Sequence, residues 1–139
     1  MRIIFSRKGF DAGNGRVASP ILDGSLVSLP IKSRYSAGIT YNDLHFNRHS
    51  LGKIVEDLTS RRIKRTYSCH LDPDLHHPAL KRRSGWRPLF GQAGAAETHL
   101  RRYGVTVGDL FLFFGWFRQA ELYERSYRYK PEASNLYAI

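Results

Sequence analysis

The chain has 139 residues, of which 42% are hydrophobic, so it is long enough for one folded core and too short for two ordinary domains. Its 22 Lys and Arg residues outnumber its 12 Asp and Glu residues, and the net charge of +10 favours polyanionic partners, with nucleic acid the first to consider. The single cysteine, Cys69, excludes an intramolecular disulfide and a thiolate metal cluster within one chain.

The first predicted element is a strand at residues 2–6, followed by a glycine-rich loop at 7–20. The apolar run at the N-terminus is too short for a signal peptide, and no stretch approaches the ~20 apolar residues of a membrane span. We therefore expect a cytoplasmic protein that does not bind membranes. Arg7, Lys8 and Asp11 lie in the loop, where a strand followed by flexible backbone is a common way to build a ligand site. An ordinary solvated loop fits the same residues.

A hairpin is predicted at residues 19–30, because Asp23-Gly24 is a strong tight-turn signal between two apolar pairs. Residues 31–47 have no clear period and are expected to form an ordered loop. The apolar residues at 50–61 follow helical spacing, and a basic cluster at 61–65 ends that helix. These cations either contact phosphates or simply favour a helix C-terminus and solvent.

The segment 69–74 carries the most suggestive chemistry. In an extended backbone His70 and Asp72 point the same way, and such a pair can bind a divalent metal or act as an acid/base couple. A third group would have to come from Asp11, Asp74 or His99. Alternatively, His70 and Asp72 hydrogen-bond to nearby backbone. The adjacent His76 and His77 are only weak indications of a metal.

Two features follow in the next stretch. Trp86 lies among four basic residues, which is typical both of a surface that stacks on a base and of a tryptophan packed under arginine side chains. A helix is predicted from about residue 93 to 103, with Gly104 as its C-terminal stop. Its glycines and alanines allow close packing or anion binding at the helix N-terminus.

Residues 108–118 form the most apolar run and are predicted to be a central strand buried on both faces. Trp116 and Arg118 near its end could lie at the rim of a pocket for a planar ligand. A core strand without further function is the alternative. Residues 119–135 are read as a polar excursion and 136–139 as a last strand. Because the chain stops inside an apolar run, we expect it to be a truncated form of a longer protein.

Together these elements predict one α+β domain at residues 1–139, with a mixed or barrel-like sheet flanked by two or three helices. Three segments resemble the bacterial and phage family called nucleotide modification associated domain 3. They are residues 4–11, residues 69–74, and residues 90–99 continuing into 108–118. The resemblance implies a role in DNA modification. Residues 107–113 are also similar to the Gly-Asp turn and strand of PUA-like barrels, including ASCH and EVE modules, which implies binding of RNA or of modified bases.

Three hypotheses for function follow, and none of them names a cofactor. In the first, the protein is an enzyme acting on a nucleotide or base, with His70, Asp72, Asp11 and His99 as catalytic residues and Arg7, Lys8 and Arg118 holding phosphate. In the second, it is a reader in which the basic residues grip nucleic acid and Trp86 or Trp116 stacks on a flipped base. In the third, it is a basic subunit that binds an acidic protein.

Overall fold

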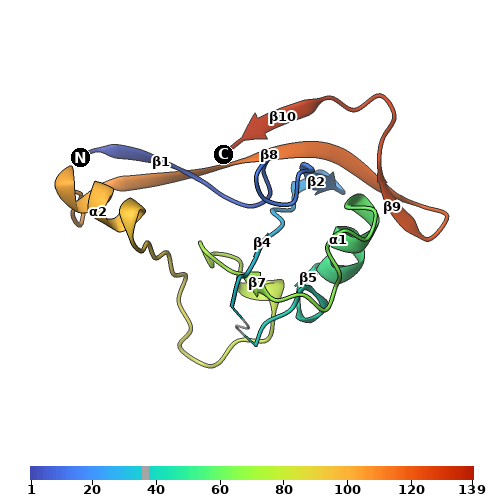
Figure 1. Cartoon of the computed structure of the whole chain (residues 1–139), viewed down its shortest axis with the longest axis horizontal. Coiled ribbons are helices and arrows are strands. Elements are labelled where there is room, and N and C mark those ends of the chain that lie inside the picture. Colours follow the sequence, from blue (N-terminus) through green and yellow to red (C-terminus); the bar gives the residue numbers. More distant parts are fainter. Residues whose placement is uncertain (36–37) are drawn as a thin grey trace.

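Figure 1 shows the computed structural model of the chain, in which the long strand β8 (Leu110–Tyr123) crosses one side and helix α1 (Leu51–Leu58) lies below its C-terminal half. The structure describes residues 1–35 and 38–139, except for the side chain of His77. The predicted loop at 31–47 therefore includes two residues outside the described part, and the metal interpretation of His77 also lies outside it.

The other elements are short. In chain order they are β1 (Ile3–Arg7), β2 (Ser19–Leu22), β3 (Ser25–Leu26), β4 (Ile31–Lys32), the 3₁₀ turn η1 (Tyr41–Asp43), β5 (His45–Phe46), β6 (His49–Ser50), β7 (Cys69–His70), the 3₁₀ turn η2 (His77–Ala79), α2 (Ala95–Arg102), β9 (Ser126–Tyr129) and β10 (Asn135–Ala138).

The sheet is organised by β8, with which four other strands pair. β1 and β2 run parallel to β8, whereas β9 and β10 run antiparallel to it. β3 extends the sheet beyond β2, and β4 with β7 and β5 with β6 form two separate ladders. The prediction of an α+β domain with a mixed sheet is confirmed. The sheet is open, so the chain does not adopt the barrel-like, PUA-like alternative.

Most of the predicted elements are present. The strand predicted at 2–6 is β1, and the hairpin predicted at 19–30 is β2 and β3 joined at Asp23-Gly24, where both residues have the positive φ of a type I′ hairpin turn. The helices predicted at 50–61 and 93–103 are α1 and α2. The strand predicted at 136–139 is β10, which pairs with β8.

The central strand differs from its prediction in length and in burial. β8 continues to Tyr123 and turns into β9, where a polar excursion was predicted. Its first half is not buried on both faces, since Leu110 is 45% exposed and Phe5 on the adjacent β1 is 63% exposed. Burial begins further along, with Phe117 and Ala120 each 5% exposed. The prediction of a strand covered on both faces is therefore wrong for its N-terminal half.

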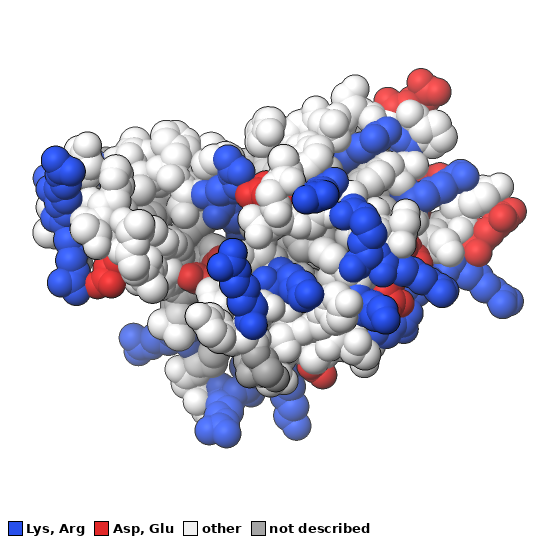
Figure 2. Space-filling view, viewed as in Figure 1, with Lys and Arg blue, Asp and Glu red and all other residues white. Residues whose placement is uncertain are grey.

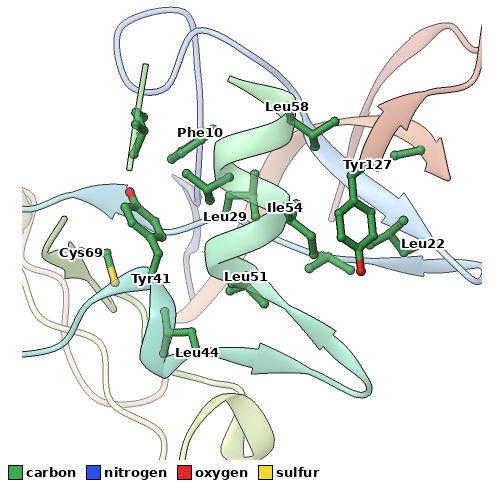
Figure 3. Packing of buried hydrophobic residues seen from close by; sticks show 14 of the residues in the cluster. Phe10, Leu22, Leu29, Tyr41, Leu44, Leu51, Ile54, Leu58, Cys69 and Tyr127 are labelled. Atoms are coloured by element: carbon green, nitrogen blue, oxygen red, sulfur yellow. The ribbon is translucent and has the colours of Figure 1, made fainter. Parts of the chain in front are cut away.

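The hydrophobic core is centred on α1 (Figure 3). Ser50 caps the helix by accepting a hydrogen bond from the Lys53 backbone N–H, and its apolar positions repeat at helical spacing so that one face is buried. Ile54 and Val55 on that face are fully buried. Phe10 packs edge-on against Tyr41 in the same core, at 6.4 Å between ring centroids. The loop after β1 is thus anchored from inside.

Candidate functional site

Two adjoining cavities lie where the loop after β1, the segment after β3 and the segment after β7 meet. The first, which we call the Asp11 cleft, has a volume of about 130 Å³ and is lined by Arg7, Lys8, Asp11, Asn14, His70 and Asp72, among others. The second, which we call the His76 cavity, has a volume of about 110 Å³ and is lined by Lys8, Ser28, Phe46, Leu71, Asp74 and His76, among others. Lys8 and Ser28 line both, so the two cavities share a wall.

The Asp11 cleft brings together residues that are far apart in the sequence. β4 pairs with β7 so that Ile31 lies opposite His70, and this short ladder places His70 and Asp72 beside the first loop. On the other side, the Lys8 backbone N–H donates to the Phe114 carbonyl over 2.7 Å and fixes the end of β1 against β8. Five of the nine residues predicted for the site line this one cleft.

Asp11 shapes the loop and is ionised. Its Oδ1 accepts the backbone N–H groups of Gly13 and Asn14, each at 2.7 Å, and its Oδ2 lies 3.0 Å from the Arg7 guanidinium. Burial opposes the charged form, but these hydrogen bonds outweigh it and lower the pKa of Asp11 below its ordinary value. A carboxylate held in this way is a weak proton acceptor, so Asp11 is better suited to orient Arg7 than to act as a general base.

Asp72 and Asp74 tie the segment after β7 to residues 89–91. Asp72 Oδ1 accepts the backbone N–H of Gly91 at 3.0 Å. The Asp74 and Leu89 backbones exchange two hydrogen bonds, of 2.8 and 3.0 Å. The Asp72 carboxylate therefore accepts a backbone hydrogen bond, as in the alternative in which it has no metal or acid/base role. Its partner, however, is distant in sequence and not nearby.

Asp74 and Arg82 form the most enclosed ion pair at the site. Arg82 donates to both carboxylate oxygens of Asp74, at 2.7 and 2.6 Å, and the two side chains are only 7% and 18% exposed for Arg82 and Asp74 respectively. The same guanidinium lies over the Trp86 ring, 4.3 Å from its centroid. One face of Trp86 is thus covered by an arginine side chain. This arrangement agrees with the alternative in which the tryptophan packs under arginine side chains.

Lys8 stands at the junction of the two cavities. Burial lowers the pKa of its ammonium group, and the nearby Asp74 carboxylate partly offsets this effect. A partly desolvated cation interacts more strongly with an anion than an exposed one, because less water screens it. Lys8 is therefore the strongest candidate at the site for binding an anionic group.

The remaining predicted residues lie elsewhere. His99 is on α2, where it lines a separate cavity with Phe90 and packs against the Tyr103 ring at 4.6 Å. Trp116 and Arg118 are in the middle of β8, between β2 and β10, and not at a strand end. Arg118 lies over the Tyr129 ring, 5.1 Å from its centroid. The structure thus separates these residues from the Asp11 cleft.

Ser28 and His76 were missed by the sequence analysis as site residues. Ser28 is a polar residue between the buried Val27 and Leu29, and this position is the only feature that distinguishes it in the sequence. His76 was considered only as a weak metal ligand. Gly9 brings the first loop against Ser28, because a Cβ added there would lie 2.5 Å from Ser28 Oγ. This close approach depends on a glycine.

A larger cavity, of about 540 Å³, lies beside the β2–β3 turn and includes Asp23, His49 and Tyr127. The buried His49 ring bonds to the Tyr127 hydroxyl at 2.8 Å and to Asp23 Oδ2 at 3.0 Å, and Arg48 also pairs with Asp23. These polar groups bond to one another and hold the turn to β6 and β9. The smaller cavities also contain ion pairs, but two residues that line them, Ser28 and His76, have buried polar atoms without a partner, and we therefore take the smaller cavities as the candidate site.

Within residues 1–35 and 38–139, no group of three or more His, Cys, Asp and Glu side chains is arranged to hold a metal ion. In that same part of the chain no helix has the length and apolar character needed to cross a membrane. A family model described as nucleotide modification associated domain 3 matches residues 2–139, essentially the whole chain. No curated protein and no solved structure matches the chain.

Proposed function

We propose that this chain, which belongs to the nucleotide modification associated domain 3 family, binds a nucleotide or a base of nucleic acid at the Asp11 cleft and acts on it. The observation that carries the proposal is that Arg7 and Lys8 share one cleft with His70. The two cations suit a phosphate, and a histidine ring can both donate and accept a proton, so His70 is the proposed proton carrier.

The surface charge supports a polyanionic ligand. Figure 2 shows Lys and Arg side chains spread over one face and gathered over α1 and β9, where they outnumber the acidic side chains among them. Such a field attracts nucleic acid and gives binding that weakens with added salt. The reader hypothesis has less support, because neither Trp86 nor Trp116 is among the residues lining the Asp11 cleft.

Replacing Lys8 is expected to weaken binding of nucleoside 5′-monophosphates by about tenfold or more. A hydrogen bond to a charged group is worth ~1.5–3 kcal/mol, and 1.4 kcal/mol corresponds to about tenfold in affinity. The measurement is calorimetric titration of Lys8→Met and of the unchanged protein at low salt, where phosphate contacts are strongest.

Lys64→Met is the matched control, because Lys64 is an exposed lysine outside both cavities and its replacement changes the net charge equally. Binding by Lys64→Met should stay within about twofold, since distant exposed charges are largely screened. Equal losses in the two variants would show that binding follows net charge alone, and the proposed cleft would be wrong.

Affinity for a phosphate monoester is expected to fall as pH rises, beginning below the ordinary lysine pKa of 10.5. Only the protonated form of Lys8 attracts phosphate, and burial lowers its pKa, so the proton is lost earlier than from an exposed lysine. The phosphate is already fully ionised above pH 7, since its second pKa is about 6. Dissociation constants measured between neutral and alkaline pH test this.

Lys8→Arg separates this cause from others, because an arginine stays protonated throughout that range. The variant is expected to bind with little dependence on pH. If its affinity falls with pH as steeply as that of the unchanged protein, a group other than Lys8 is responsible and the assignment of Lys8 to phosphate is wrong.

A further inference from the structure

Two residues that line the His76 cavity each have a buried polar atom without a hydrogen-bond partner. In the described residues, three buried side-chain atoms lack a hydrogen bond: Ser28 Oγ, His76 Nε2 and Arg118 Nε. The first two, Ser28 Oγ and His76 Nε2, belong to residues that line the His76 cavity. Buried polar groups are nearly always paired, because an unpaired one forfeits the hydrogen bond that it made to water. Neither atom has accessible surface in the free protein, but each belongs to a side chain at the cavity wall that gains a hydrogen bond if it turns toward a ligand with complementary polar atoms.

The rest of the cavity is suited to a flat ring. The His76 imidazole is stacked on the Phe46 ring at 5.1 Å with an interplanar angle of 23°. Leu51, Leu71 and Ala79 add apolar surface. The volume of about 110 Å³ corresponds to roughly four water molecules at ~30 Å³ each, which is room for one small ring system but not for a whole nucleotide.

The His76 ring is best suited to a neutral partner. Burial lowers its pKa, and the positive charges of Lys8 and Arg82 lower it further. The imidazole is therefore uncharged at neutral pH, and its Nε2 offers one donor or acceptor to a partner without a formal charge. An anionic group would instead be drawn to the Asp11 cleft, where Arg7 lies beside Lys8.

We propose that the His76 cavity is the base pocket of the site, in which a nucleobase packs beside Phe46 and His76. The Ser28 and His76 side chains turn toward the base so that Oγ and Nε2 hydrogen-bond to it, while Lys8 holds the attached phosphate from the adjoining cleft. This inference rests on the proposed function. Beyond that function, it assigns the base of the ligand to the His76 cavity and the phosphate to the Asp11 cleft. A ligand with a charged end and a flat polar end matches two small contiguous cavities, of which neither alone reaches the ~300 Å³ of ordinary ligand pockets.

The experiment compares nucleoside 5′-monophosphates with ribose 5-phosphate, which carries the phosphate and sugar but no base. The unchanged protein should bind at least one of the monophosphates about tenfold more tightly or better, because the base pairs with otherwise unsatisfied atoms. Ser28→Ala and His76→Phe should each reduce that advantage severalfold and leave binding of ribose 5-phosphate unchanged. Phenylalanine keeps the ring that stacks on Phe46 and removes both nitrogens.

Thermal unfolding distinguishes this role from a structural one. Ser28→Ala removes a hydroxyl that has no partner in the free protein, so its melting temperature should stay the same or rise. Ser84→Ala, at an exposed serine outside both cavities, is the control for the substitution itself. A lower melting temperature for Ser28→Ala, with the base advantage intact, would show that the hydroxyl serves the fold and would overturn the inference.

The outcomes separate the two proposals. If no phosphate ligand binds, including ribose 5-phosphate, the proposed function fails and the base pocket fails with it. If ribose 5-phosphate binds as tightly as every monophosphate, the phosphate site stands and the base pocket alone is wrong. Both proposals are supported if the tighter binding of a monophosphate over ribose 5-phosphate is lost in Ser28→Ala and in His76→Phe, and if Lys8→Met weakens the binding of all these ligands.

Discussion

Gly15→Ala is expected to lower the free energy of unfolding by about 3 kcal/mol or more, because it combines overpacking in the core with strained backbone. Gly15 has a φ of +82°, and a Cβ there would lie 2.3 Å from Cδ2 of the Phe10 ring. Phe10 is fully buried, so its ring cannot move aside without disturbing Tyr41 and the core around α1. Urea unfolding followed by circular dichroism gives the change.

Gly24→Ala is the matched control for the backbone part of this effect. Gly24 has a similar φ of +77°, but nothing lies within 4 Å of an added Cβ. Gly24→Ala should lower the free energy of unfolding by about 1 kcal/mol, as expected for a non-glycine residue in the left-handed conformation with open space around its Cβ. Equal losses at the two positions would show that Phe10 relaxes freely and that the first loop is not anchored by the core.

Anchoring of this loop links stability to the proposed site. Phe10 is buried immediately before Asp11, and Asp11 joins Gly15 in an isolated backbone bridge. The Asp11 carboxylate then orients Arg7 at the cleft. A loop that is fixed at both ends holds its polar side chains in place before a ligand arrives, which lowers the entropy cost of binding. Glycines thus allow the sharp turn that the site requires.

Local signals in the sequence predicted the elements well where turn chemistry is specific. Asp23-Gly24 is a residue pair that readily adopts positive φ, so the first hairpin was predictable. The β8–β9 hairpin was not, because its turn consists of Glu124 and Arg125, at φ of 46° and 72°, which are residue types that rarely adopt this conformation. The polar, tyrosine-rich sequence that follows therefore resembled an excursion.

The apolar run at 110–114 shows a second limit of the sequence. Hydrophobic pattern indicates a strand, but the degree of burial depends on which other elements cover the sheet. Here the core cluster around α1 includes Ala120 and Tyr127, from the C-terminal half of β8 and from β9. Phe90 packs against Phe111 and Phe113 and covers part of the first half. Such long-range packing leaves no mark within the strand itself.

The candidate site was predictable only in part, for a related reason. Arg7, Lys8, Asp11, His70 and Asp72 are residue types that suggest chemistry in any sequence, so they were found. Ser28 and His76 differ from other serines and histidines only in being buried without a partner, which is a property of the fold. His99 carries the same chemistry as His70 but lies on α2 beside a different cavity. Residue type alone could not separate the two.

Arg82→Met is expected to destabilise the fold by about 3–5 kcal/mol, because it leaves the Asp74 carboxylate enclosed without its bidentate partner. The pair is nearly buried, so solvent screens it little. Arg83→Met removes an exposed arginine at the next position and should change the free energy of unfolding by less than about 0.5 kcal/mol. Chemical unfolding of the two variants is compared directly.

The double variant Asp74→Leu with Arg82→Met tests the cause. If the loss comes from a stranded charge, removing that charge should recover more than half of it, since buried ion pairs are often replaceable by apolar residues at little cost. If the double variant is instead no more stable than Arg82→Met, the stranded charge is not the cause, and the loss comes from packing of the arginine side chain against Trp86, 4.3 Å from its ring centre.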